Sequence, residues 1–392
     1  MTTLIPDLQL SDIAPSVIQS EIRAMSVECD RIGGINLAQG ICDTDLPQIV
    51  GESAIEAIRS GLNTYTRLDG VAPLREAIAE KLKADNDLQV DPATQVLVTS
   101  GATGALYASL LALLNPGDEV IVFEPFYGYH INTLKSLRMK PVPVALAAPD
   151  WQLDLDELRQ SITSRTRAII VNTPSNPSGK VFTRQELEGL AALAIENNLF
   201  VFTDEIYEYF LFDGARHISL ATLPGMERRT ITISGLSKTF SITGWRIGYI
   251  AASQEWIPSI GYFHDLTYVC APAPLQYGAA AGMSALAGSS FYTDLSIEYQ
   301  IKRDQLCNAL ADGGLAPSIP QGAYYVLADA SRVPGKSAKE KARTLLATTG
   351  IASVAGSAFF RPGRGEHLLR FCFGKKMPDL LRACNKLRNL TF

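Results

Sequence analysis

Short apolar runs rich in β-branched residues alternate with segments of helical periodicity between about residue 74 and residue 252. This alternation limits the possible folds more than any other feature. Strands are expected over residues 96–99, 120–123, 168–171, 199–203, 231–233 and 247–250. Strands that are apolar throughout, rather than at alternate positions, are typical of a parallel sheet covered by helices on both faces. The sequence therefore predicts an α/β fold built on a mostly parallel sheet.

The pattern changes after about Pro274, where long helical segments replace the alternation. Helices are expected over residues 279–287, 292–311, 337–348 (with Ser337 as N-cap) and 378–390, with a strand at 368–373. A chain of 392 residues also exceeds the roughly 250–300 residues at which single cores stop growing. We therefore predict a large domain over residues 51–275 and a smaller α+β domain over 276–392, which the N-terminal segment 1–50 joins.

Composition argues against several classes of protein. A net charge of −5 offers no basic surface, so nucleic acid is not an expected partner. No apolar run approaches the roughly 20 residues that a membrane span needs, and no secretory signal is recognisable. The six cysteines and four histidines fall in no metal-ligand spacing, so neither a metal site nor a disulfide framework is expected. Reduced thiols fit a cytoplasmic protein.

Polar and small residues follow five of the predicted strands, and open parallel sheets bind ligands beyond the carboxyl ends of their strands. These positions supply a Gly-rich helix start, an aromatic ring, an amide, a carboxylate with a phenol, and an amine. The residues are Gly101-Ala102-Thr103, Tyr127, Asn176, Asp204 with Tyr207, and Lys238. Each alone has an ordinary structural explanation, such as turn or capping chemistry. Together they would suit one flat, phosphorylated, nitrogen-containing aldehyde.

Lys238 lies just past an apolar strand, among small and hydroxyl residues. A desolvated ammonium is costly unless it is paired or neutral. An amine of lowered pKa can instead form a Schiff base with a carbonyl cofactor. Arg246, eight positions later, and the hydroxyl of Ser237 would then bind an anion, most simply the phosphate of pyridoxal 5′-phosphate.

Residues 235–248 fit the lysine-attachment pattern of the class I/II pyridoxal-phosphate-dependent aminotransferases, in which Gly-x-Arg-x-Gly follows the lysine. The chain resembles this family, which includes aspartate, aromatic and kynurenine aminotransferases, from about Asn36 to Arg370. The resemblance implies fold type I, with a large domain of the seven-stranded type. It also implies pyridoxal 5′-phosphate as cofactor and a homodimer with shared active sites.

The resemblance assigns roles residue by residue. Lys238 would form the Schiff base, Asp204 would pair with the ring nitrogen, and Tyr207 and Asn176 would hydrogen-bond the ring oxygen. Tyr127 would stack on the ring. The phosphate would lie against Gly101, Ala102, Thr103, Ser237 and Arg246, with Tyr65 reaching the phosphate of the partner subunit. Gly40, Asn176 and Arg370 would contact the substrate, with Arg370 binding its α-carboxylate.

The expected reaction is a ping-pong transfer of an amino group from an amino acid to a 2-oxo acid. A lyase or synthase on the same scaffold is the alternative, because the fold and cofactor alone do not decide between them. A cofactor-sensing regulator lacks the basic DNA-binding module it would need, and a nicotinamide oxidoreductase lacks GxGxxG after the first strand. The sequence shows no dedicated arginine for a substrate side chain. Tyr127, Tyr129, Phe359 and Phe360 would permit an aromatic or other neutral amino donor.

Overall fold

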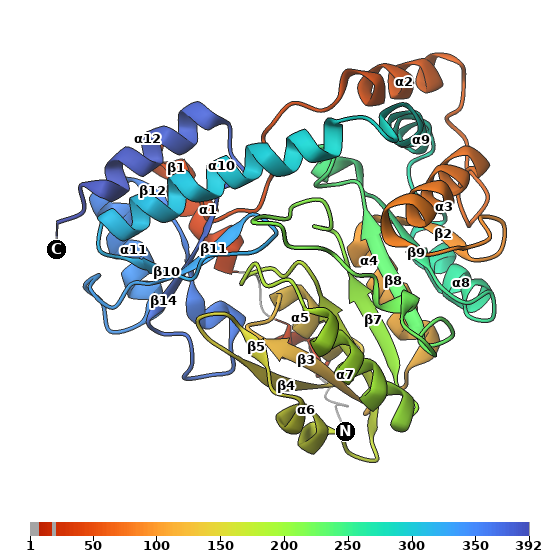
Figure 1. Cartoon of the computed structure of the whole chain (residues 1–392), viewed down its shortest axis with the longest axis horizontal. Coiled ribbons are helices and arrows are strands. Elements are labelled where there is room, and N and C mark those ends of the chain that lie inside the picture. The colour runs from red at the N-terminus through yellow and green to blue at the C-terminus, as the bar shows by residue number, and fades with distance from the viewer. Residues whose placement is uncertain (1–7, 18–20, 392) are drawn as a thin grey trace, which may run out of the picture.

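In the computed structural model, which describes residues 8–17 and 21–391, the central region forms one eight-stranded sheet (Figure 1). Its strand order is β2 (Val96–Ser100), β9 (Ile247–Ala251), β8 (Thr230–Gly235), β7 (Phe200–Asp204), β6 (Thr166–Asn172), β3 (Glu119–Glu124), β4 (Lys140–Ala147) and β5 (Gln152–Leu153). The pairings from β8 through β7, β6 and β3 to β4 are parallel, and the other three are antiparallel. The prediction of a mostly parallel sheet is confirmed.

All six predicted strands are present, but β4 and the two-residue β5 were not predicted. β4 contains Pro141 and Pro143, and proline is unfavourable inside a sheet because it has no N–H to donate. Here β4 lies next to the edge, paired with β3 on one side and with only β5 on the other. Tertiary pairing therefore overrides the local sequence signal.

Helices cover both faces of the sheet because its buried side chains alternate between them. Val120 and Ile170 pack on one face with α4 (Gly101–Leu113), α5 (Gly128–Ser136) and α8 (Ile257–Tyr268). Their neighbours Ile121 and Ile169 face the opposite way, toward α6 (Leu155–Ser161) and α7 (Arg184–Glu196). Near β2 and β9, the covering helices are α3 (Ala72–Asn86) and α9 (Ala273–Leu286).

A second, antiparallel sheet lies at the left in Figure 1, in the order β10 (Ala316–Pro317), β11 (Tyr325–Asp329), β14 (Leu368–Cys372) and β13 (Val354–Ala355). The helices of this region are α10 (Phe291–Asp312), α11 (Ala338–Thr349) and α12 (Met377–Arg388), and the Ser337 side chain caps α11 as predicted. The N-terminal strand β1 (Ile35–Asn36), which follows α1 (Glu21–Arg31), pairs with β12 (Ile351–Ala352). Helix α2 (Gln48–Arg59) packs on α9.

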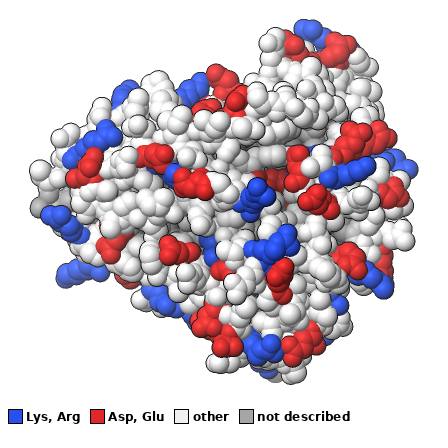
Figure 2. Space-filling model, viewed as in Figure 1, with Lys and Arg blue, Asp and Glu red and all other residues white. Residues whose placement is uncertain are grey.

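Four short 3₁₀ helices complete the secondary structure of the described residues: η1 (Ala14–Ser16), η2 (Leu220–Thr222), η3 (Thr243–Trp245) and η4 (Gly356–Phe359). Among the described residues, no helix is both long enough and apolar enough to cross a bilayer. On the face that Figure 2 shows, acidic and basic side chains are interspersed. That face therefore carries no large patch of one sign.

Candidate active site

A cavity of about 500 Å³ opens where the carboxyl ends of the parallel strands meet the second sheet. Eleven of the thirteen predicted site residues line it: Gly40, Ala102, Thr103, Tyr127, Asn176, Asp204, Tyr207, Ser237, Lys238, Arg246 and Arg370. Gly101 lies beside it, in contact with Arg246. Tyr65 does not line the cavity, and the residue is 81% exposed. The fold thus brings together residues that lie up to 330 positions apart (40 to 370).

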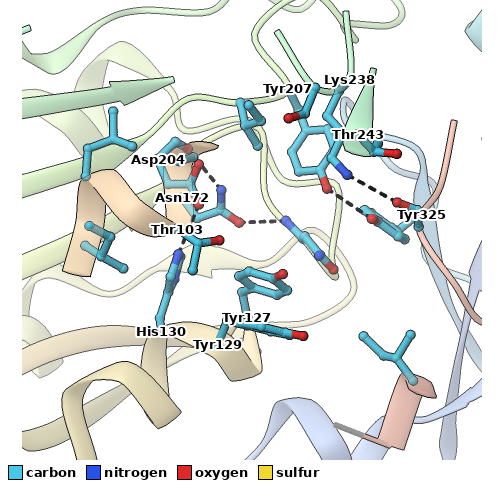
Figure 3. Close-up of a pocket in the computed structure, with 18 of the residues that line it drawn as sticks. Thr103, Tyr127, Tyr129, His130, Asn172, Asp204, Tyr207, Lys238, Thr243 and Tyr325 are labelled. Carbon is cyan, nitrogen blue, oxygen red and sulfur yellow. Dashed lines mark hydrogen bonds and ion pairs between the residues drawn. The ribbon is translucent and has the colours of Figure 1, made fainter. Parts of the chain in front are cut away.

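Lys238 follows β8 and points into the cavity (Figure 3). Its Nζ donates a hydrogen bond to the backbone oxygen of Gly40 at 3.2 Å and lies 5.9 Å from the centre of the Tyr324 ring. Burial lowers the pKa of this amine below that of ordinary lysine. The amine is therefore uncharged, and able to attack a carbonyl, at a lower pH than an exposed lysine.

Asp204 ends β7, and only one of its two carboxylate oxygens has a protein partner. Oδ2 lies 3.0 Å from Nε2 of His130, which is in the first turn of α5. Oδ1 is buried and has no hydrogen-bond partner among the described residues. A buried carboxylate oxygen without a donor is costly. The protonated nitrogen of a pyridine ring would supply the missing donor, so the site fits pyridoxal phosphate on this point.

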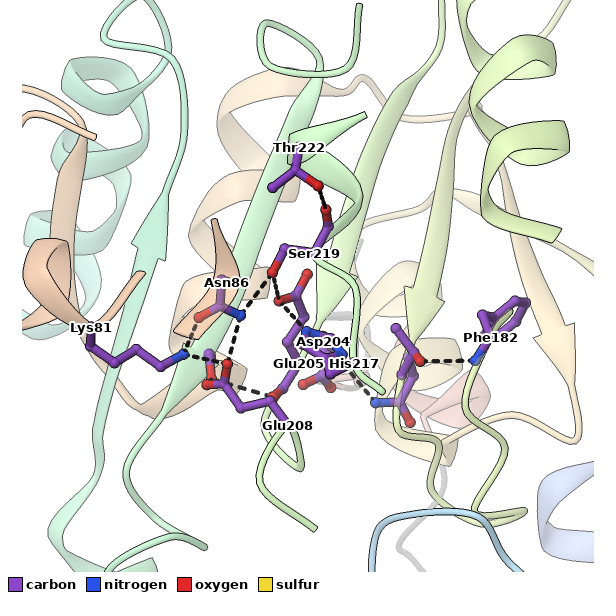
Figure 4. Close-up of polar contacts among 12 residues, drawn as sticks. Lys81, Asn86, Phe182, Asp204, Glu205, Glu208, His217, Ser219 and Thr222 are labelled. Atoms are coloured by element: carbon purple, nitrogen blue, oxygen red, sulfur yellow. Dashed lines mark hydrogen bonds and ion pairs between the residues drawn. The ribbon is translucent and has the colours of Figure 1, made fainter. Parts of the chain in front are cut away.

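A buried polar network behind β7 supports Asp204 (Figure 4). Glu205 accepts from Ser219 Oγ at 2.7 Å and lies 2.8 Å from His217 Nε2. Glu208 accepts hydrogen bonds from Lys81 and from Asn86 Nδ2. These contacts tie the residues after β7 to α3 and to the segment before η2, and so hold the strand end in place.

Three side chains of this network, Glu205, Glu208 and His217, bring possible metal-ligand atoms within 4.8 Å of one another. Both carboxylates, however, already have protein partners, including the ammonium of Lys81. We therefore assign no metal to the cluster, and the absence of a metal site stays a prediction.

Two buried tyrosines and an aromatic stack border the space in front of Asp204. The hydroxyls of Tyr207 and Tyr325 lie 3.0 Å apart, and burial raises the pKa of Tyr207, so this phenol stays protonated and able to donate. Tyr127 stacks on Tyr129, with ring centres 5.2 Å apart, and meets the edge of the His130 ring. Figure 3 shows the Tyr127 ring facing the same space as Asp204 and Lys238.

Gly101 opens α4 with a φ of +71°, a conformation that favours glycine. A Cβ at Gly101 would lie 2.4 Å from Nη2 of Arg246, so the guanidinium packs directly on the start of the helix. Gly248 on β9 approaches just as closely, since its Cβ would lie 2.6 Å from the backbone nitrogen of Ala102. Unpaired backbone N–H groups at a helix start, next to an arginine, form a site suited to phosphate.

Arg370, on β14, is only 1% exposed. It donates to Asn176 Oδ1 at 2.9 Å and to the backbone oxygen of Ala38 at 2.5 Å. The ring centres of Tyr325 and Phe359 lie 4.4 and 4.8 Å from its guanidinium carbon. Two of its five N–H groups are thus used, and Nε is buried without a partner among the described residues. The remaining donors are available to a substrate carboxylate.

Several other residues that line the cavity were not predicted: Arg23, His130, Asn172, Thr243 and Tyr325. Tyr129, which was expected near the pocket, lines it as well. Asn172 connects Asp204 and Asn176, because it donates to the backbone oxygen of the first and accepts from the backbone N–H of the second. It directly follows the strand predicted over residues 168–171, and that position was a usable signal. His130 and Tyr325 gave none, because neither follows a predicted strand of the large sheet. Phe360 packs on Trp151 and is not among the lining residues.

Comparison with known proteins decides the family. The sequence model of the family aminotransferase class I and II matches residues 32–387 of this chain. The chain belongs to this family. It is 36% identical, over 93% of its length and 94% of the relative's, to the probable N-succinyldiaminopimelate aminotransferase of Mycobacterium tuberculosis. It is 35% identical to aromatic-amino-acid aminotransferase 2 of Thermococcus litoralis, with 98% of each chain covered.

Solved structures agree with this assignment. The N-succinyldiaminopimelate aminotransferase structure from M. tuberculosis superposes with a TM-score of 0.94 at 35% identity, covering 98% of this chain and 100% of that one. YbdL of Escherichia coli, for which a methionine aminotransferase function is described, gives 0.93 at 32% identity, covering 98% and 100%. This aminotransferase therefore has the fold-type-I architecture and transfers amino groups, as predicted. The relatives give no support to the lyase or synthase alternative.

Proposed function

We propose that this aminotransferase holds pyridoxal 5′-phosphate on Lys238 and exchanges the amino group of an amino acid with a 2-oxo acid. The family is generally dependent on this cofactor. One observation carries the proposal: a single cavity contains both a buried amine of lowered pKa, on Lys238, and the unpartnered Oδ1 of Asp204. An aldehyde and a protonated ring nitrogen would satisfy the two groups together.

The residues divide the work as follows. Arg246 and the N–H groups that start α4 would bind the phosphate, and Tyr127 would pack on the ring. Pyridoxal phosphate, when bound, supplies an aldehyde for the amino group and a ring that takes up the electrons left on the substrate Cα. The carboxyl group of Asp204 would pair with the ring nitrogen, and a negative charge beside that nitrogen would hold a proton there and strengthen this effect. Tyr207 and Asn176 line the same cavity and would hydrogen-bond a ring oxygen.

On the substrate side, Arg370 binds the α-carboxylate and so fixes the orientation of the amino acid. The Lys238 amine takes up the proton that leaves the Cα, for which its lowered pKa suits it. Gly40 lets the Tyr325 hydroxyl pack directly against the backbone at this part of the wall, since a Cβ there would lie 1.8 Å from that oxygen. These three residues thus prepare the amino acid for transfer of its amino group.

The proposal includes a homodimer in which Tyr65 of each subunit reaches the phosphate of the other. The 81% exposure of Tyr65 and the exposed Ile55, Ile58 and Leu62, which precede it in the chain, support this arrangement. We also expect the chain to divide into an N-terminal segment (residues 1–50) that joins the small domain, a large domain (51–275) and the small domain (276–392). We expect the protein to be cytoplasmic. Mixing subunits that carry Tyr65→Phe with subunits that carry Lys238→Ala should restore activity in the mixed dimer. If each subunit contained a complete site of its own, no restoration would follow.

Borohydride reduction followed by peptide mass spectrometry tests the covalent bond. We expect a cofactor adduct on the peptide that contains Lys238, and no adduct in Lys238→Ala. That variant should still bind the cofactor, through Arg246 and Asp204, but should not turn over. An adduct at another lysine, or full turnover by the variant, would refute the assignment. Release of ammonia without any 2-oxo acid acceptor would instead indicate a lyase.

A further inference from the structure

The buried imidazole of His264, on α8, has no part in the proposed function. The residue is fully buried, and its Nε2 accepts a hydrogen bond from the backbone N–H of Ser100 at 2.9 Å. Burial lowers the pKa of His264 to about 4, so the ring is neutral throughout the neutral range. Because a backbone nitrogen can only donate, the single ring proton of the neutral imidazole is on Nδ1 and leaves Nε2 free to accept.

Ser100 occupies the turn at which the chain passes from β2 into α4. It is the last residue of β2 and the N-cap of α4, so no residue separates the strand from the helix. The next residue, Gly101, takes up the change of direction with a φ of +71°. No side chain caps α4, and the N–H groups of its first turn are those assigned to the phosphate. The bond to His264 therefore fixes the residue that leads into the phosphate site.

Helix α8 is itself held firmly against this part of the molecule. It packs on α4 and on β2, at the right in Figure 1. Tyr268, one turn after His264, packs on the first turn of α4, since a Cβ at Gly104 would lie 3.3 Å from Cε2 of the tyrosine ring. Near the start of α8, a Cβ at Gly261 would lie 2.7 Å from Cδ1 of Leu68. Contacts this close leave the helix little freedom to move, so the imidazole is a rigid acceptor.

Packing alone does not account for a histidine at this position. Nδ1 of His264 is buried without a hydrogen-bond partner among the residues that the structure describes, a cost that an apolar side chain would avoid. What the imidazole supplies, and an apolar side chain cannot, is the acceptor for Ser100.

We propose that His264 is a positioning residue for the cofactor phosphate, because its Nε2 holds Ser100 and thereby the N–H groups at the start of α4 in the arrangement that binds the anion. The inference rests on the proposed function, in which the start of α4 takes the phosphate. His264 touches neither the phosphate site nor the cavity lining itself and acts through the backbone of Ser100.

Titration of the cofactor-free enzyme with pyridoxal 5′-phosphate and with pyridoxal, the same aldehyde without the phosphate, tests this role through the absorbance of the bound aldehyde. His264→Gln keeps an acceptor where Nε2 lies, whereas the shorter side chain of His264→Asn does not reach that position. We expect His264→Asn to bind pyridoxal 5′-phosphate about tenfold more weakly, the effect of one buried donor left without a partner. Its affinity for pyridoxal should be unchanged, and His264→Gln should retain most of the affinity for the phosphorylated aldehyde.

Ile260→Val, at another fully buried position of α8, is the matched control. It should lower the stability measured in urea without changing the preference for the phosphorylated aldehyde. With saturating cofactor, the KM of His264→Asn for amino acids should also stay unchanged, because the substrate site is not involved.

The inference is overturned if His264→Asn binds both aldehydes as the unsubstituted enzyme does, if it loses affinity for both equally, or if His264→Gln loses as much as His264→Asn. Amide exchange at Ser100 in the unsubstituted, cofactor-free enzyme needs no variant to fold: slow exchange is expected, and exchange at the rate of an unbonded amide would also overturn it. Failure of the proposed function would look different. Neither aldehyde would then attach to Lys238, while binding of inorganic phosphate, followed by calorimetry, would still respond to His264→Asn.

Discussion

The replacement of Arg370 by methionine separates a substrate-binding role from a structural one. Arg370 is buried, yet no carboxylate of the described residues forms an ion pair with it, and its two hydrogen bonds go to an amide oxygen and a backbone oxygen. A buried charge without a counter-charge costs several kcal/mol. Its removal offsets the loss of two hydrogen bonds worth about 0.5–1.5 kcal/mol each. We therefore expect the free energy of unfolding to change by less than about 2 kcal/mol.

Catalysis should respond differently. Loss of a buried carboxylate–guanidinium pair should cost about 2–5 kcal/mol, which lowers kcat/KM for amino acids by about 30-fold to several thousand-fold. The assay follows the absorbance of the bound cofactor during the amino-donor half-reaction, alongside denaturant unfolding of the same samples. The absorbance of the resting enzyme should be unchanged, because Arg370 is not assigned to the cofactor.

Arg303→Met is the matched control. Arg303 is equally buried in the same region but pairs with Asp213 and Asp304. It should lose about 1.5–3 kcal/mol of stability and keep its KM. If Arg370→Met unfolds as readily as the control, or if its KM for every amino acid stays unchanged, the reasoning about Arg370 is wrong.

Three further predictions concern the cofactor site and its surroundings. Gly101→Ala should weaken cofactor binding, because its Cβ would displace Arg246. Gly117→Ala, at a similar positive φ with open space around it, should show only backbone strain of about 1–2 kcal/mol by denaturant unfolding. The rate of cofactor attachment to cofactor-free protein should rise with pH as the Lys238 amine loses its proton, and should level off below pH 10.5, the ordinary pKa of lysine. Stopped-flow absorbance measures this rate. A rate that still increases through pH 10.5 would contradict the lowered pKa. Glu124→Gln removes the negative charge at the end of β3, where Glu124 accepts a hydrogen bond from Arg361 Nη2 at 3.1 Å. The free energy of unfolding, measured in urea, should fall by roughly 1.5–3 kcal/mol. An unchanged free energy of unfolding would show that this contact does not stabilise the protein.

Much of the fold could be predicted because the signals are local. Apolar runs marked six strands of the large sheet, and all six are present. The prolines of β4 hid a strand whose existence depends on pairing with β3. The helices after Pro274 were found from periodicity and from the cap at Ser337. Contacts between distant segments, such as Glu124 with Arg361, left no trace in the pattern.

The cofactor site was also largely predictable. Lys238, Asp204 and Asn176 each follow an apolar run, and the carboxyl ends of the parallel strands bring them to one edge of the sheet. The amino acids after those runs therefore determined the family and the predicted chemistry.

Only the tertiary structure decided what surrounds these groups. It placed His130 on Asp204, left one oxygen of that carboxylate without a partner, and brought Arg23 of α1 to the cavity. The physical reason is range. A strand and its terminal residue are set by neighbours along the chain, whereas desolvation, unpaired buried atoms and the cations available to a substrate depend on segments that meet only after folding.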